Sequence, residues 1–140
     1  MLHAFTHTLS RLCPPDQRIL LAVSGGVDSM AMLHLFHTTG HKIGVAHCNF
    51  QLRDAASDED EQLVQQTCQQ WKIPFHTQRF ETNNYAAVNR LSTQMAAREL
   101  RYAWFREVMQ VHAYDKLATA HHLNDNLETT LLNFVRGTSI

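Results

Sequence analysis

Short apolar runs alternate along this chain with longer segments in which apolar residues recur every three or four positions. The short runs have the length of buried strands, whereas the spacing in the longer segments is typical of helices that pack by one face. The expected strands are residues 18–23, 42–48, 75–80 and 116–120. The expected helices are residues 28–39, 58–71, 93–111 and 123–135, with one more near the N-terminus at Leu2, Phe5, Leu9 and Leu12.

The alternation of strands and helices predicts an α/β fold with a doubly wound parallel sheet and right-handed crossovers. We expect the strand order 3-2-1-4, which is that of Rossmann-like sheets. Because such sheets usually carry more strands, we also expect that a further strand is missing from this chain.

Residues that favour helix ends support these boundaries. Gly40 and Gly137 follow expected helices, where glycine commonly ends a helix in a left-handed conformation. Ser57 is expected to be an N-cap with Asp60 at the capping-box position, and Ser92 or the threonine after it would cap the long helix. The acidic residues after Ser57 are interpreted as stabilising the helix start rather than as a metal site, because negative charge is favoured there.

The composition fits one globular domain: 44% of the 140 residues are hydrophobic and 18% are charged. A formal net charge of −1 gives no overall attraction to nucleic acid, so any such contact needs a local patch or residues outside the chain. Cys13, Cys48 and Cys68 form no Cys-x-x-Cys pair, and an odd count argues against a disulfide framework. With no signal-peptide pattern and no membrane-spanning apolar run, we expect a cytoplasmic protein.

A glycine-rich turn joins the first expected strand to the next helix. Its residues are Ser24, Gly25, Gly26, Val27, Asp28 and Ser29. The glycines let the backbone approach an anion closely, and the helix start supplies N–H groups and partial positive charge. A carboxylate beside phosphates is repulsive unless a cation lies between them, so Asp28 predicts Mg²⁺ bridging a polyphosphate. The turn lacks the lysine and hydroxyl residue of a Walker loop, and an ordinary glycine turn is the alternative.

More polar residues follow the fourth expected strand. Ligands in such folds bind beyond the carboxyl ends of the strands, where the strand order switches. Because the first and fourth strands would be neighbours, Asp28 would face His121, His122 and Asp125 across one crevice. Asp125 is therefore a candidate second Mg²⁺ ligand, and either histidine could contact a phosphate or move a proton. The alternative for Asp125 is that it caps the last helix.

Two arginines on the long helix are further candidates. Arg98 and Arg101 are three residues apart and so share a helical face. A guanidinium near the crevice could neutralise charge on a transferring phosphate, although both arginines could equally be solvated and paired with acidic residues. After the second strand, His47 is interpreted as a strand-end histidine with a hydrogen-bond partner, and Arg53 as a candidate phosphate contact.

The glycine-rich turn is similar to the PP-loop of ATP pyrophosphatases. Over nearly its whole length, the chain resembles the N-terminal domain of the tRNA(Ile)-lysidine synthetases. The segments that carry this resemblance are, in order, residues 24–29, 46–53, 57–61, 97–102 and 118–137. Many members of that family have a histidine where Phe50 stands and an aspartate where Asn124 stands, so Asp125 carries more weight than Asn124.

The resemblance implies an adenine-nucleotide α-hydrolase-like fold and a two-step ligase reaction. ATP would adenylate the C2 oxygen of the wobble cytidine in tRNA(Ile) with a CAU anticodon, and L-lysine would then displace AMP to give lysidine. The PP-loop would bind the pyrophosphate, Asp28 and Asp125 would ligate Mg²⁺, and Arg98 with His122 (or His121) would stabilise charge at the α-phosphate. Residues 1–140 would be the N-terminal catalytic domain of a longer protein, with its tRNA-binding domains outside this chain.

Two other functions are compatible with the turn. Another PP-loop ATP pyrophosphatase, such as a tRNA thiolase or a glutamine-dependent amide synthetase, should show paired cysteines or an amidotransferase region, and neither is apparent. A non-catalytic nucleotide-binding module would not need carboxylates at both Asp28 and Asp125. The pattern gives no indication of oligomeric state.

Overall fold

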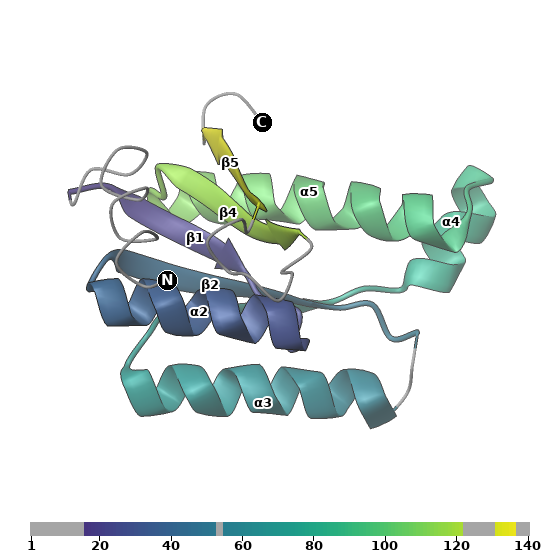
Figure 1. The fold of residues 1–140 in the computed structure, drawn as a ribbon. Helices are drawn as coiled ribbons and strands as arrows, with labels where there is room; N and C mark the ends of the chain where they lie inside the picture. Colours follow the sequence, from purple (N-terminus) through teal and green to yellow (C-terminus); the bar gives the residue numbers. More distant parts are fainter. Residues whose placement is uncertain (1–15, 53–54, 122–130, 137–140) are drawn as a thin grey trace.

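The computed structural model describes residues 16–52, 55–121 and 131–136 (Figure 1). Its strands are β1 (Arg18–Ala22), β2 (Lys42–Asn49), β3 (Phe75–Arg79), β4 (Lys116–His121) and β5 (Leu131–Arg136). Its helices are α2 (Val27–Thr39), α3 (Ala55–Trp71), α4 (Thr82–Asn89) and α5 (Thr93–His112). The expected N-terminal helix and Gly137 lie outside the described residues, as do Arg53, His122, Asn124 and Asp125.

One five-stranded sheet organises the chain, in the order β3-β2-β1-β4-β5. The first four strands of that order are parallel, which confirms the predicted order 3-2-1-4. Ala22 of β1 pairs with Ala46 of β2 on one side and with Thr119 of β4 on the other. The carboxyl ends of these three strands therefore lie side by side, at the position where the strand order switches.

Helices cover both faces of the sheet: α2 and α3 lie on one side and α5 on the other (Figure 1). The fully buried run in β1 explains this, since Ile19 and Leu21 pack into the core beneath α2 and α3 while Leu20 packs toward α5. A strand buried on both faces needs such a continuous apolar run. Neither α5 nor any other helix that the structure describes combines the length and apolar character needed to cross a bilayer.

The C-terminal segment corrects the sequence prediction. Residues 131–136 form strand β5, antiparallel to β4, where the apolar pattern predicts the end of a helix over 123–135. Residues 123–130 lie outside the described part of the chain. A short apolar run has no periodicity that separates strand from helix, and here pairing covers the edge of β4. The sheet is therefore mixed at this edge rather than wholly parallel.

Three smaller corrections concern helices. Residues 82–89 form α4 in a segment where the sequence pattern predicts neither a strand nor a helix, and its buried Ala86 helps to explain why. Helix α3 begins at Ala55, so Ser57 lies inside the helix and is not its N-cap. On α5, the apolar spacing predicts a buried stripe at Met95, Leu100, Ala103, Trp104, Val108 and Val111. Met95 and Val111 are instead 56% and 69% exposed. The buried residues of α5 are Ala96, Phe105, Val108 and Met109.

Candidate active site

The backbone of the glycine-rich turn after β1 is fixed by hydrogen bonds to the side chain of one serine. Ser29 is buried, and its Oγ accepts hydrogen bonds from the backbone N–H groups of Ser24 and Gly25, both at 3.1 Å. The same hydroxyl donates to the carbonyl oxygen of Gly26 at 3.1 Å. The turn is therefore fixed before any ligand arrives, which reduces the entropy that binding must overcome.

Gly25 is required by packing as well as by backbone conformation. Its φ of 97° lies in the region that side chains other than glycine rarely adopt. A Cβ at this position would also lie 3.0 Å from Cβ and 3.3 Å from Cα of Asp60 in α3. Helix α3 therefore packs directly against the turn, a contact that the chain pattern alone does not indicate.

The start of α2 lies immediately after the glycines. Gly26 is its N-cap, with φ −74° and ψ 168°, and as a glycine it has no side chain to accept a hydrogen bond from the first helical turn. Asp28 is half-buried in the first helical turn, and Val27 is exposed. Backbone N–H groups in the first turn have no partner within their own helix, so this end of a 13-residue helix favours an anion.

A cavity of about 140 Å³ adjoins the turn, between the carboxyl ends of β1, β2 and β4 and one side of α5. Its lining is mainly apolar and aromatic. The lining residues are Ala22, Val23, Ser24, Ala46, Cys48, Phe50, Arg101, Tyr102, Phe105, Thr119 and Ala120. Because Ser24 belongs both to the turn and to this lining, the two features form one continuous site.

The structure separates the two arginines of α5. Arg101 lines the cavity, and its buried Nε has no hydrogen-bond partner among the described residues. Arg98 is exposed and does not contribute to the cavity lining. Their guanidinium carbons lie 5.0 Å and 5.3 Å from the centre of the Tyr102 ring, so both positive charges flank one aromatic wall. The role predicted for Arg98 stays a prediction, and of the two candidate arginines it is Arg101 that lines the cavity.

Cys48 lies in the cavity wall, where its thiol is a poor nucleophile. Burial raises the pKa of its thiol to about 12, and the nearby charge of Arg101 lowers it by a smaller amount. The thiol is therefore protonated at neutral pH, whereas a nucleophilic cysteine must be a thiolate. Cysteine-based sulfur transfer at this position is disfavoured.

His47 lies on the opposite side of β2 from Cys48 and is 2% exposed. Its Nδ1 is 2.8 Å from the carbonyl oxygen of Val23, the residue just before the turn. A carbonyl only accepts, so Nδ1 carries a proton and donates it to this oxygen. Nε2 has no partner in the described part of the chain. The predicted strand-end hydrogen bond is thus present at one ring nitrogen only.

The predicted crevice between Asp28 and the residues after β4 is described only in part. Strands β1 and β4 are neighbours, as that prediction requires, and β4 ends at His121. His122 and Asp125 lie outside the described residues, so their proposed roles stay predictions. Among residues 16–52, 55–121 and 131–136, no group of three His, Cys, Asp or Glu side chains is placed to hold a metal ion.

Sequence reasoning missed the aromatic part of the cavity. Phe50, Tyr102 and Phe105 converge on it from the loop after β2 and from α5. A signal existed in the chain: Tyr102 and Phe105 are three residues apart and so share a face, and Tyr102 follows Arg101 directly. Which helical face meets the sheet is a tertiary property, so that signal could not be resolved beforehand.

A family model described as a PP-loop domain matches residues 1–140. Among curated proteins, the chain is 47% identical over 126 residues to the tRNA(Ile)-lysidine synthase of Bacteroides thetaiotaomicron, covering 90% of this chain and 30% of that protein. It is also 47% identical over 134 residues to the enzyme of that name from Chlorobaculum tepidum, covering 93% of this chain and 40% of that protein. The chain thus spans well under half the length of these relatives.

A solved structure with a similar fold is the NH3-dependent NAD synthetase from Campylobacter jejuni, in complex with a nitrate ion. The TM-score is 0.62, and the match covers 84% of this chain and 55% of that one. Sequence identity is 12%, so the likeness supports the fold alone.

Proposed function

The chain belongs to the PP-loop domain family, and from this premise we propose that it binds ATP and uses it to activate tRNA(Ile) for ligation to L-lysine. One observation carries the proposal: a preorganised turn with anion-binding character continues, at Ser24, into an aromatic cavity. The names of the curated relatives support the tRNA substrate. We further propose that residues 1–140 act as the N-terminal catalytic domain of a longer cytoplasmic enzyme.

The site divides into two parts that match the two ends of ATP. The backbone N–H groups in the first turn of α2 would bind the β- and γ-phosphates, because those of Ser24, Gly25 and Gly26 already donate to serine hydroxyls within the turn. The cavity would take the nucleoside, because its walls are largely apolar and aromatic and a purine gains by stacking there. Arg101 lines the cavity, and its guanidinium would neutralise charge on the α-phosphate.

The residues at the turn fit Mg²⁺ bound together with a polyphosphate. Mg²⁺ is usually held by one or two carboxylates, with phosphate oxygens and water completing the shell. Asp28 in the first turn of α2 would supply one carboxylate, and we propose Asp125 as the second. When bound, the ion would neutralise charge on the pyrophosphate leaving group.

The proposed reaction has two displacements. The C2 oxygen of the wobble cytidine in a CAU anticodon would attack the α-phosphorus, and the turn would hold the departing pyrophosphate. The amine of L-lysine would then attack C2 and displace AMP, giving lysidine. Arg98, Arg101 and His122 (or His121) would stabilise charge around the α-phosphate. The protonated Cys48 thiol argues against a thiolase at the same site.

An omission experiment tests this function. ATP should be converted to AMP and pyrophosphate only when L-lysine and tRNA(Ile) with the CAU anticodon are both present. Asp28→Asn should reduce turnover by at least 100-fold, on the order of the loss of one transition-state charge contact. The matched control Asp16→Asn changes an exposed carboxylate before β1 and should leave turnover unchanged. Full activity of Asp28→Asn, or ATP cleavage without tRNA, would refute the assignment.

A further inference from the structure

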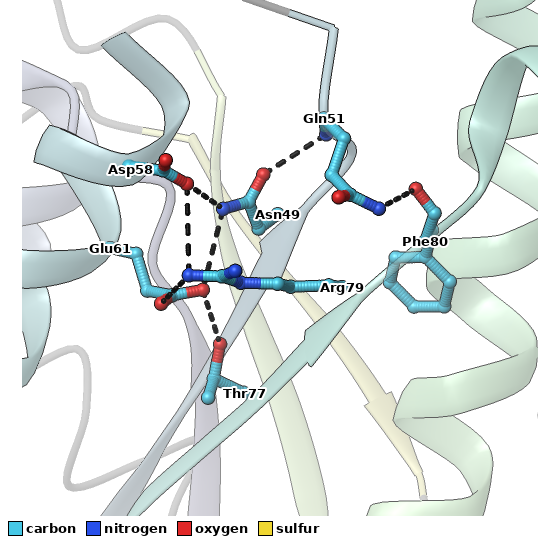
Figure 2. Close-up of polar contacts among 7 residues, drawn as sticks. All are labelled: Asn49, Gln51, Asp58, Glu61, Thr77, Arg79 and Phe80. Atoms are coloured by element: carbon cyan, nitrogen blue, oxygen red, sulfur yellow. Dashed lines mark hydrogen bonds and ion pairs between the residues drawn. The ribbon is translucent and has the colours of Figure 1, made fainter. Parts of the chain in front are cut away.

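A polar cluster surrounds the last residue of β2 (Figure 2). Asn49 is 1% exposed, and its Nδ2 donates to Oδ1 of Asp58 at 3.0 Å and to Oε1 of Glu61 at 3.4 Å in α3. Its Oδ1 accepts from the backbone N–H of Gln51 at 3.0 Å. One buried amide therefore ties the end of β2 both to α3 and to the loop that follows.

The hydrogen bonds around Asn49 hold Phe50 between two fixed neighbours. Gln51 has φ 56°, and its Nε2 donates to the carbonyl oxygen of Phe80 at 2.9 Å. The backbone N–H of Phe80 donates in turn to the carbonyl oxygen of Asn49, also at 2.9 Å. The rings of Phe50 and Phe80 stack with centroids 5.6 Å apart. Phe50 is thus held by its backbone and by its ring where it lines the cavity.

The neighbouring charges make an amide, rather than a carboxylate, suitable at position 49. The Glu61 side chain is 14% exposed and also accepts from Oγ1 of Thr77 at 3.4 Å and from Arg79 at 3.2 Å. A hydrogen bond from Arg79 to Glu61, with the charges of Glu61 and Asp58, raises the pKa of Arg79. Among the described residues, the guanidinium of Arg79 is shared by two carboxylates, as Figure 2 shows, so a third carboxylate at position 49 would be repelled.

We propose that Asn49 is a positioning residue that fixes Phe50 in the cavity wall and thereby sets the affinity for the nucleoside part of ATP. The inference rests on the proposed function for the identity of the ligand. Asn49 itself points to α3, on the other side of β2 from the cavity, so it acts through Phe50 and not by contact with the ligand. None of these hydrogen bonds includes a residue of the turn, so we expect phosphate binding there to be unchanged when they are altered.

Asn49→Asp tests the proposal, because it keeps an acceptor for the Gln51 N–H and replaces the donor to the two carboxylates. The dissociation constants of ATP and of inorganic tripolyphosphate are measured for the chain by calorimetry with Mg²⁺. We expect ATP binding to weaken about tenfold, the order of one lost aromatic stack, and tripolyphosphate binding to stay unchanged. Equal weakening of both ligands, or no change in either, would overturn the proposal.

A double-mutant cycle and a control sharpen the result. If Asn49 acts through Phe50, Asn49→Asp should cause no further loss of ATP affinity in a Phe50→Leu background, and additive losses would contradict the proposal. Thr77→Val removes another partner of Glu61 and should leave both dissociation constants unchanged. If Asn49→Asp does not fold, as judged by circular dichroism, Gln51→Ala replaces it, because Gln51 is exposed and its side chain holds Phe80.

The wild-type chain separates this inference from the proposed function. Normal ATP binding that is insensitive to Asn49→Asp would refute the positioning role and leave the proposed function intact. Wild-type affinity for ATP no greater than for tripolyphosphate would mean that the cavity does not hold the nucleoside, which overturns the inference while the phosphate-binding turn stands. Binding of neither ligand would overturn both.

Discussion

Replacing Gly25 by alanine should cost more stability than the same change at the other glycines flanking α2. Alanine at φ 97° adds backbone strain of about 1–2 kcal/mol. The new Cβ would lie 3.0 Å from Cβ and 3.3 Å from Cα of Asp60, and relieving such overpacking costs about 1–3 kcal/mol. The sum is about 2–5 kcal/mol, a large share of the roughly 5–15 kcal/mol that stabilises a typical domain.

The other two glycines separate these contributions. Gly40 has φ 76° but open space around its Cβ position, so Gly40→Ala should cost only the strain, about 1–2 kcal/mol. Gly26 has φ −74°, and its nearest atom would be Oγ of Ser24 at 3.5 Å, so Gly26→Ala should change stability by less than about 1 kcal/mol.

Urea unfolding of the wild type and the three single variants, followed by circular dichroism, measures each free energy of unfolding. The expected order of loss is Gly25→Ala, then Gly40→Ala, then Gly26→Ala. Equal losses for Gly25→Ala and Gly40→Ala would show that α3 does not press on the turn. The contact with Asp60 would then have no energetic weight, and the reasoning about the glycine-rich turn would fail.

Three further predictions concern the rest of the structure. Gly44→Ala should lower the unfolding free energy by about 1–3 kcal/mol, because its Cβ would overlap the hydroxyl of Tyr114, and Tyr114→Phe should weaken that penalty. Burial lowers the pKa of His76, and the charges of His112 and Arg18 lower it further. As the pH falls, the unfolded chain therefore binds a proton at this residue before the folded chain does. Unfolding free energy should therefore fall as pH drops below about 6.5, and His76→Gln should flatten that slope in urea titrations. Cys48 should react with iodoacetamide at pH 8 only after unfolding, because its pKa is about 12. Fast labelling of the folded wild type that is lost in Cys48→Ser would contradict this prediction.

Structural features that depend on a local sequence pattern could be predicted correctly. The apolar runs of β1 and β4 predict buried parallel strands, because both faces of such strands must be covered, and the alternation of strands and helices predicts the order of a doubly wound sheet. Two helix ends are also confirmed: Gly40 ends α2 in the left-handed conformation, and the Oγ of Ser92 accepts from the N–H of Met95 at 3.2 Å. Each depends on residues within one turn of the helix, so no tertiary information is needed.

Prediction failed where the answer depends on distant contacts. Residues 131–136 form a strand because β4 offers an edge to pair with, which nothing within that segment reveals. The spacing of Arg98 and Arg101 shows that they share a face but not which of them reaches the cavity. The helical phase of α5 is about one residue away from the apolar stripe read from the sequence, and for that reason Ala96 is buried while Met95 is exposed.

The two faces of β2 explain how one short strand serves both halves of the site. Alternate residues of a strand point to opposite faces, so Ala46 and Cys48 line the cavity while His47 and Asn49 point toward α2 and α3. His47 holds the carbonyl of the residue before the glycine-rich turn, and Asn49 holds the loop that carries Phe50. The turn and the cavity wall are therefore fixed to the same rigid strand, two residues apart. A ligand that occupies both would meet a geometry already set, and its binding energy would not be spent on ordering either part.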